Sequence, residues 1–223
     1  MKIGIIVAMD KELRLLLEQV EGAEQVQADG YTYYTGTIGH AYVVAGKCGI
    51  GKVNAALGAL DMIDRFHPDI MINTGVAGGV GHTSVGDVVL ASEVAYHDVW
   101  CGPGTEPGEA AGCPRLFACG VDAAGYAARL GVKSGLVASG DIFVSRQEDV
   151  RRILDMYPQA MAVDMESAAI AHTCHRRSVP MVCIRVVSDT PGQEADNAAQ
   201  YDDFWENAPA RTFGCARNLI DLL

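Results

Sequence analysis

The sequence has little positive charge: 17 lysines and arginines stand against 28 aspartates and glutamates, which gives its 223 residues a formal net charge of -11. Charged residues make up only 20% of the chain. A main partner such as a nucleic-acid backbone or an anionic membrane surface requires the opposite balance. The composition therefore argues against both and favours small or neutral ligands.

Long hydrophobic runs are also missing, since no run approaches the roughly 20 residues of a membrane-spanning helix. The first residues are apolar up to Met9, but charged residues follow at once and no small-residue cleavage site appears. We expect a first strand there rather than a signal peptide. A soluble, cytoplasmic protein is predicted.

The cysteines lack any Cys-x-x-Cys spacing, although there are seven of them, at positions 48, 101, 113, 119, 174, 183 and 215. This scatter indicates neither a zinc site nor a disulfide framework, and reduced thiols account for it most simply. We expect no metal and no cofactor.

Apolar runs of strand length alternate with helical patterns, and 49% hydrophobic residues suffice for a full core. Strands are predicted at 3–9, 31–38, 41–45, 69–74, 86–91, 134–138, 160–163 and 181–187. Helices are predicted at 10–21, 53–66, 147–156 and 166–176, with a final helix from Asp202 interrupted by Pro209 and a loop at 101–114. This order predicts a single domain over 1–223, a three-layer α/β/α sandwich with a central mixed, largely parallel sheet.

Several ligand-competent side chains follow predicted strands. Two acidic segments, 162–166 and 185–189, end apolar runs, and Glu12, the glycine-rich stretch 75–79 and Phe143 also follow strands. Ligands of open α/β sheets bind outside the carboxyl ends of the strands, so these features are expected to converge. Carboxylates with an aromatic ring and an arginine, but no metal or nucleophile, suit acid and base chemistry on a sugar that carries a flat base.

Other motifs have simpler explanations. Residues 46–53 come close to a phosphate-binding P-loop, but Val53 stands where a magnesium-binding hydroxyl belongs, so a tight turn opening a helix is favoured over nucleotide hydrolysis. His97 lacks a second ligand at a metal-type spacing, and His172 with His175 is interpreted as a surface pair. Ser188 lacks the turn of a hydrolase nucleophile.

Taken in order, many short segments resemble the 5'-methylthioadenosine/S-adenosylhomocysteine nucleosidases, within the purine nucleoside and uridine phosphorylase family. The matching segments are 1–6, 8–9, 12, 49–53, 72–75, 77–79, 96–98, 139–141, 163, 165–166, 169–172 and 188–189. This set of segments, in this order, is specific to the family, whereas a single glycine-rich loop would not be. The resemblance implies a nucleoside phosphorylase-like fold and hydrolysis of the N-glycosidic bond of the two named nucleosides, releasing adenine, as in methionine salvage.

The resemblance also implies residue roles. Asp189 would protonate N7 of the leaving adenine, for which its pKa must be raised. Glu12, assisted by Arg185, would orient and deprotonate the attacking water. Glu166 would accept hydrogen bonds from the ribose hydroxyls, with Met165 against the sugar.

By the same resemblance, Phe143 would stack on adenine, the Val144 backbone would bind its edge, and Gly78 would let the ring approach closely. Met9, Ile50 and Tyr201 would line the apolar pocket for the 5' substituent. Pro114 would reach the neighbouring subunit's site, which implies a homodimer.

Phosphorolysis is disfavoured because Asp10, Lys11 and Asn73 occupy the regions where the related phosphorylases place arginines. The chain departs from the nucleosidase pattern at Val76, where many members have serine, and at Asp164, which replaces the more usual glutamate. The loop 99–104 and the stretch between 189 and 201 also differ. Alternatives are a nucleosidase for another 5'-modified adenosine, such as 5'-deoxyadenosine or aminodeoxyfutalosine, a phosphorylase, or a non-catalytic nucleoside-binding protein.

Overall fold

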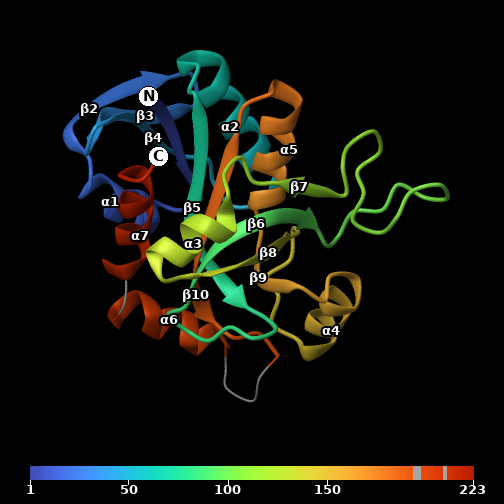
Figure 1. Cartoon of the computed structure of the whole chain (residues 1–223). Helices are drawn as coiled ribbons and strands as arrows, with labels where there is room; N and C mark the ends of the chain where they lie inside the picture. The colour runs from blue at the N-terminus through green and yellow to red at the C-terminus, as the bar shows by residue number, and fades with distance from the viewer. Residues whose placement is uncertain (193–196, 208–209) are drawn as a thin grey trace.

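The computed structural model describes residues 1–192, 197–207 and 210–223, and its elements form one mixed sheet with helices on both faces (Figure 1). The strands are β1 Lys2–Val7, β2 Glu21–Ala28, β3 Tyr31–Ile38, β4 Ala41–Lys47, β5 Ile70–Gly79, β6 Val88–Tyr96, β7 Leu116–Ala118, β8 Lys133–Ser139, β9 Ala160–Asp164 and β10 Met181–Asp189. The helices are α1 Asp10–Leu17, α2 Lys52–Phe66, α3 Ala123–Leu130, α4 Gln147–Met156, α5 Ser167–Arg177, α6 Asn197–Asn207 and α7 Ala210–Ile220.

The sheet closes so that the carboxyl ends of β5, β9 and β10 meet. Strands β4, β1, β5 and β10 pair in parallel, as do β6, β8 and β9. Antiparallel β10–β6 and β5–β9 pairs join the two groups, so that β5, β10, β6, β8 and β9 close into a ring. The closure brings side chains at the ends of β9 and β10 close to the start of α1, although the chain separates them widely.

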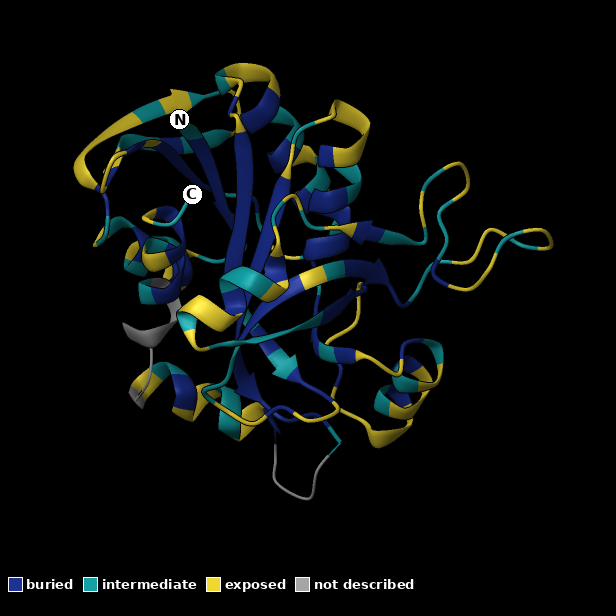
Figure 2. Cartoon of the chain, in the orientation of Figure 1, coloured by how far each residue is buried: buried dark blue, intermediate teal, exposed yellow. Residues whose placement is uncertain are grey.

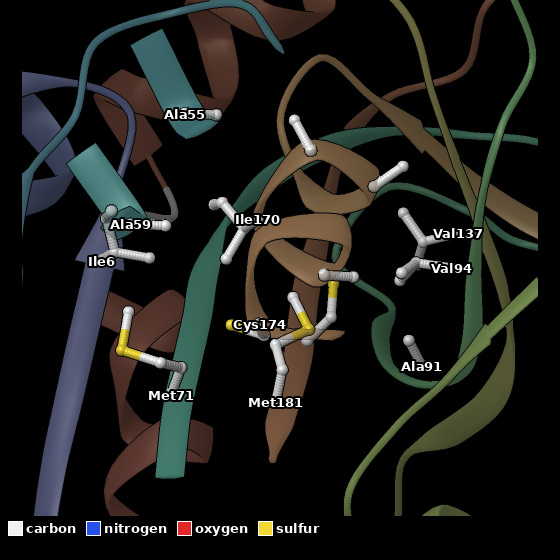
Figure 3. Packing of buried hydrophobic residues seen from close by; sticks show 14 of the residues in the cluster. Ile6, Ala55, Ala59, Met71, Ala91, Val94, Val137, Ile170, Cys174 and Met181 are labelled. Carbon is white, nitrogen blue, oxygen red and sulfur yellow. The ribbon is translucent and has the colours of Figure 1, made fainter. Parts of the chain in front are cut away.

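Three apolar clusters fill the space between the sheet and its helices. One lies under α2 and α5, where side chains from both helices meet those of the sheet (Figure 3). A second lies under α1, α3 and α7, and a third lies under α4. The central strands are buried along most of their length, whereas the loop between β6 and β7 extends away from the body with exposed and half-buried residues (Figures 1 and 2). The predicted three-layer α/β/α fold is confirmed.

The predicted elements differ from the observed ones in a few places. Strands β2 and β7 and helix α3 were not predicted, and the first helix ends at Leu17 rather than at residue 21. The stretch 75–79 is not a loop but the second half of β5. A helix break at Pro209 falls outside the described residues.

Across the described ranges, no helix combines the length and the apolar character that crossing a membrane requires.

Candidate active site

A cavity opens at the carboxyl ends of the strands, with an empty volume of about 640 Å³ that includes its mouth. It is lined by Ala8, Met9, Glu12, Ile50, Val76, Ala77, Gly78, Ile142, Phe143, Val144, Val163, Asp164, Met165, Glu166, Ser188, Asp189 and Tyr201. Four of these residues carry carboxylates.

Backbone N–H groups fix the carboxylate of Glu12 in the first turn of α1. Those of Ala8 and Met9 donate to Oε2 at 2.9 and 3.0 Å, and that of Val76 donates to Oε1 at 3.0 Å. Gly75 permits this approach, because a Cβ atom there would overlap the carboxylate. Burial raises the pKa of Glu12, although the nearby charge of Arg185 and the three N–H donors oppose the rise. A fixed carboxylate with a raised pKa suits a general base.

Glu166 precedes α5 and reaches across to the turn that opens α2. The backbone N–H of Gly51 donates to its Oε1 at 2.8 Å. Gly49 and Gly51 adopt positive φ angles of 98° and 94°, which glycine tolerates best. The P-loop-like segment is therefore a turn that presents an N–H to a carboxylate. Burial raises the pKa of Glu166 to about 7, and the neighbouring charge of Asp164 adds to the rise.

Arg185 does not line the cavity but lies beneath it, with a side chain only 2% exposed. Its guanidinium contacts Asp164 Oδ2 through Nε at 2.8 Å and through Nη2 at 2.7 Å. Nη2 also donates to Asn73 and, at 2.9 Å, to Ser167. Asp164 in turn accepts short hydrogen bonds from the hydroxyls of Ser139 and Ser167. The acid whose role the sequence leaves open thus forms a buried ion pair with Arg185.

Asp189 ends β10 and faces the cavity with both oxygens bonded. Ser188 Oγ donates to Oδ1 at 2.6 Å, and Asn197 Nδ2 donates to Oδ2 at 3.2 Å. Burial raises the pKa of Asp189, while these two donors favour its charged form and limit the rise. Asn197, at the start of α6, also donates to the carbonyl of Val144 at 3.3 Å. Sequence reasoning missed Asn197, because no pattern marks an asparagine eight residues beyond a strand end.

Phe143 and Val144 follow β8 and form one wall of the cavity. The Phe143 side chain is 52% exposed, which leaves its ring free to cover a flat ligand. Gly78 also lines the cavity, packed so closely that a Cβ atom there would come within 2.7 Å of Pro191 and 3.1 Å of Val163. A slot between a ring and a backbone segment can hold a flat heterocycle.

Met9, Ile50 and Tyr201 also line the cavity. The Tyr201 hydroxyl lies 3.3 Å from Met9 Sδ. Pro114 lies elsewhere, where it lines a second cavity with Phe117 and His175 of its own chain.

His97 and His172 do not line the cavity. His97 is buried, and its neighbour Asp98 pairs with Lys52 at 2.7 Å. His172 is half-buried rather than a surface residue, because its ring nitrogens contact Tyr96 at 3.2 Å and Cys113 at 2.9 Å. In the part of the chain that the structure describes, no group of three or more histidine, cysteine or acidic side chains could hold a metal ion.

Comparison with known proteins places this site in a family. The model of the phosphorylase superfamily matches residues 2–221. A 5'-methylthioadenosine/S-adenosylhomocysteine nucleosidase from Desulfotalea psychrophila is 39% identical over 231 positions, covering 100% of this chain and 98% of the relative. The chain belongs to the 5'-methylthioadenosine/S-adenosylhomocysteine nucleosidase family.

Solved structures of the same family share the fold closely. The nucleosidase from Neisseria meningitidis, in complex with methylthio-immucillin-A, is 36% identical with a TM-score of 0.93, covering 100% of this chain and 99% of that one. The nucleosidase from Colwellia psychrerythraea, in complex with adenine, is also 36% identical, with a TM-score of 0.92 and coverage of 99% and 95%. The resemblance inferred from the sequence is confirmed.

The structure brings together ten of the twelve residues expected at a nucleosidase site, all except Arg185 and Pro114. Arg185 reaches the site through Asp164 and through its charge on Glu12. The roles of the individual residues stay predictions.

Proposed function

We propose that this protein hydrolyses the N-glycosidic bond of 5'-methylthioadenosine and S-adenosylhomocysteine, releasing adenine and the 5-thioribose product. The observation that carries the proposal is a cavity whose described lining residues include four carboxylates and one free ring face but no lysine or arginine. A phosphate dianion would have to lie among carboxylates without a compensating cation. Water, which is neutral, is the nucleophile that this arrangement favours.

In the proposed mechanism, three carboxylates have separate tasks. Breaking the bond develops negative charge on the base and positive charge on the ribose, and protonation of N7 by Asp189 makes adenine a better leaving group. Burial around Asp189 favours the protonated form that this step needs. Glu12, held by three N–H groups, removes a proton from water as it attacks the ribose. Glu166, with Met165 beside the sugar, holds the ribose hydroxyls.

Phe143, Val144 and Gly78 would hold the adenine, and Met9, Ile50 and Tyr201 the 5' substituent. Phe143 and Gly78 support the first assignment because both line the cavity, one with an exposed ring and the other without a side chain. The carbonyl of Val144 and Asp189 already share one amide donor, from Asn197, so the amino group of adenine could bridge the same two acceptors.

The test is adenine release from each nucleoside, measured for the wild type, Asp189→Asn and Glu12→Gln. Each substitution keeps the side-chain shape and should lower kcat about 10²- to 10⁴-fold, as expected for loss of a general acid or base. Full activity of Asp189→Asn would refute the acid role. Stimulation by phosphate, with ribose 1-phosphate among the products, would show a phosphorylase instead.

We also propose a homodimer located in the cytoplasm, in which the loop carrying Pro114 reaches the neighbouring subunit's site. Exposed apolar side chains support a second copy: Val53 and Leu57 on α2 are 70% and 53% exposed, and Trp100 on the loop is 63% exposed. Light scattering after size-exclusion chromatography tests the dimer. A monomer with full activity would contradict the contribution of Pro114.

A further inference from the structure

A row of aromatic rings leads out of the cavity to a lysine. The Phe143 and Tyr201 ring centroids are 6.3 Å apart, and those of Tyr201 and Trp205 are 6.1 Å apart. Lys11 Nζ lies 5.5 Å from the centroid of Trp205. Trp205 is one helical turn beyond Tyr201 on α6, and Lys11 is two residues beyond Met9 at the start of α1. Lys11 and Trp205, which do not line the cavity, therefore lie beside Met9 and Tyr201, which do.

The charge of Lys11 is available to a ligand. An aromatic face attracts an ammonium group without neutralising it. Lys47, by contrast, is paired with Asp10 at 2.7 Å. Within the described ranges, Lys11 forms no ion pair with a carboxylate. It places an unneutralised positive charge at the mouth of a site whose interior carries only acidic groups, in a chain of net charge -11.

We propose that Lys11, held by Trp205, determines specificity for substrates whose 5' substituent ends in a carboxylate. This proposal rests on the proposed nucleosidase function. With adenine against Phe143 and the ribose at Glu166, the 5' substituent points past Met9 and Tyr201, towards Lys11. S-Adenosylhomocysteine carries a carboxylate at the end of that substituent, whereas methylthioadenosine ends in a methyl group. The same charge would favour aminodeoxyfutalosine, whose 5' substituent also bears a carboxylate.

The test compares kcat/KM for the three substrates in the wild type, Lys11→Met, Lys11→Arg and Arg14→Met. Arg14 is the matched control, because it lies on the same helix, is exposed and carries the same charge. Lys11→Met should lower the ratio of kcat/KM for adenosylhomocysteine to that for methylthioadenosine about two- to fivefold, the size expected for one exposed ion pair. Lys11→Arg should restore the ratio, Arg14→Met should not change it, and added salt should reduce it in the wild type.

If Lys11→Met leaves kcat/KM relative to methylthioadenosine unchanged for both adenosylhomocysteine and aminodeoxyfutalosine, or if Arg14→Met causes an equal fall, the proposal is overturned while the nucleosidase function stays intact. Failure of the wild type to release adenine from any of the three would instead refute the proposed function. A ratio that falls only for aminodeoxyfutalosine would support the carboxylate site and identify that compound as the source of the carboxylate.

Discussion

Replacing Glu166 by glutamine should make the protein more stable while impairing its proposed function. Burial and the neighbouring Asp164 raise the pKa of the Glu166 carboxyl from 4.5 to about 7. Between these values the folded protein holds a proton that the unfolded chain has released. The stability that Glu166 contributes is therefore fully present below pH 4.5 and is lost as the pH rises through 7.

The magnitude follows from the same pKa difference. At about 1.36 kcal/mol per pH unit, the difference between 4.5 and about 7 corresponds to about 3 kcal/mol above pH 8. Glutamine keeps the shape of the glutamate side chain and an oxygen that can accept a hydrogen bond from the backbone N–H of Gly51, but it does not ionise. Glu166→Gln should thus match the wild type near pH 4.5 and exceed its free energy of unfolding by about 3 kcal/mol at pH 8.5.

Urea unfolding at intervals from pH 4.5 to 8.5 measures this difference for the two proteins in parallel. Subtracting one curve from the other removes the contributions of groups that do not interact with Glu166, including Asp189, whose pKa burial also raises. The comparison near pH 4.5, where the two proteins should be equally stable, is the internal control for any change in packing caused by the glutamine. If the two curves run parallel over the whole range, Glu166 does not titrate there and the reasoning is wrong.

Two further substitutions test the groups that hold these carboxylates. Asp164→Asn leaves the buried guanidinium of Arg185 without its ion-pair partner and should lower the free energy of unfolding by about 3–5 kcal/mol, measured in urea. Asn197→Ala removes a hydrogen bond that favours the charged form of Asp189, so the pKa of Asp189 should rise. In a pH–rate profile of adenine release, the fall in activity at high pH should therefore begin at a higher pH than in the wild type. If it begins at the same pH, Asn197 does not position Asp189.

Elements with their own hydrophobic pattern were predictable from the sequence, and the others were not. Helix α4 was predicted at its observed bounds because its apolar positions recur at helical spacing. Strand β2 has mostly exposed residues and no alternating apolar face, so only its pairing with β3 defines it. Strand β7 has three residues, too few for any periodicity.

Some features of the candidate site were likewise predictable from the sequence, and others were not. Glu166 and Asp189 were predicted to converge as residues at strand ends. They do so although β9 and β10 run in opposite directions, because both strands pair with β5 at Gly78. The ion pair of Asp164 with Arg185 was not predictable, because it joins β9 to β10, and sequence order does not reveal that both strands pair with β5. Likewise, the fit of Glu12 against Gly75 depends on the distance between α1 and β5, which no local pattern specifies.

The position of Arg185 explains how one site can contain several carboxylates with raised pKa values. A free guanidinium among them would stabilise their charged forms and keep them deprotonated. Instead, Asp164 neutralises the guanidinium of Arg185 through two contacts below the cavity. The charge of Arg185 lowers the pKa values of Glu12 and Glu166, but burial raises them by more. The pair thus positions the strand ends without supplying a net positive charge to the cavity. Because the cavity then offers no cation to an anionic nucleophile, the same pairing that keeps the carboxyl groups protonatable also favours water over phosphate.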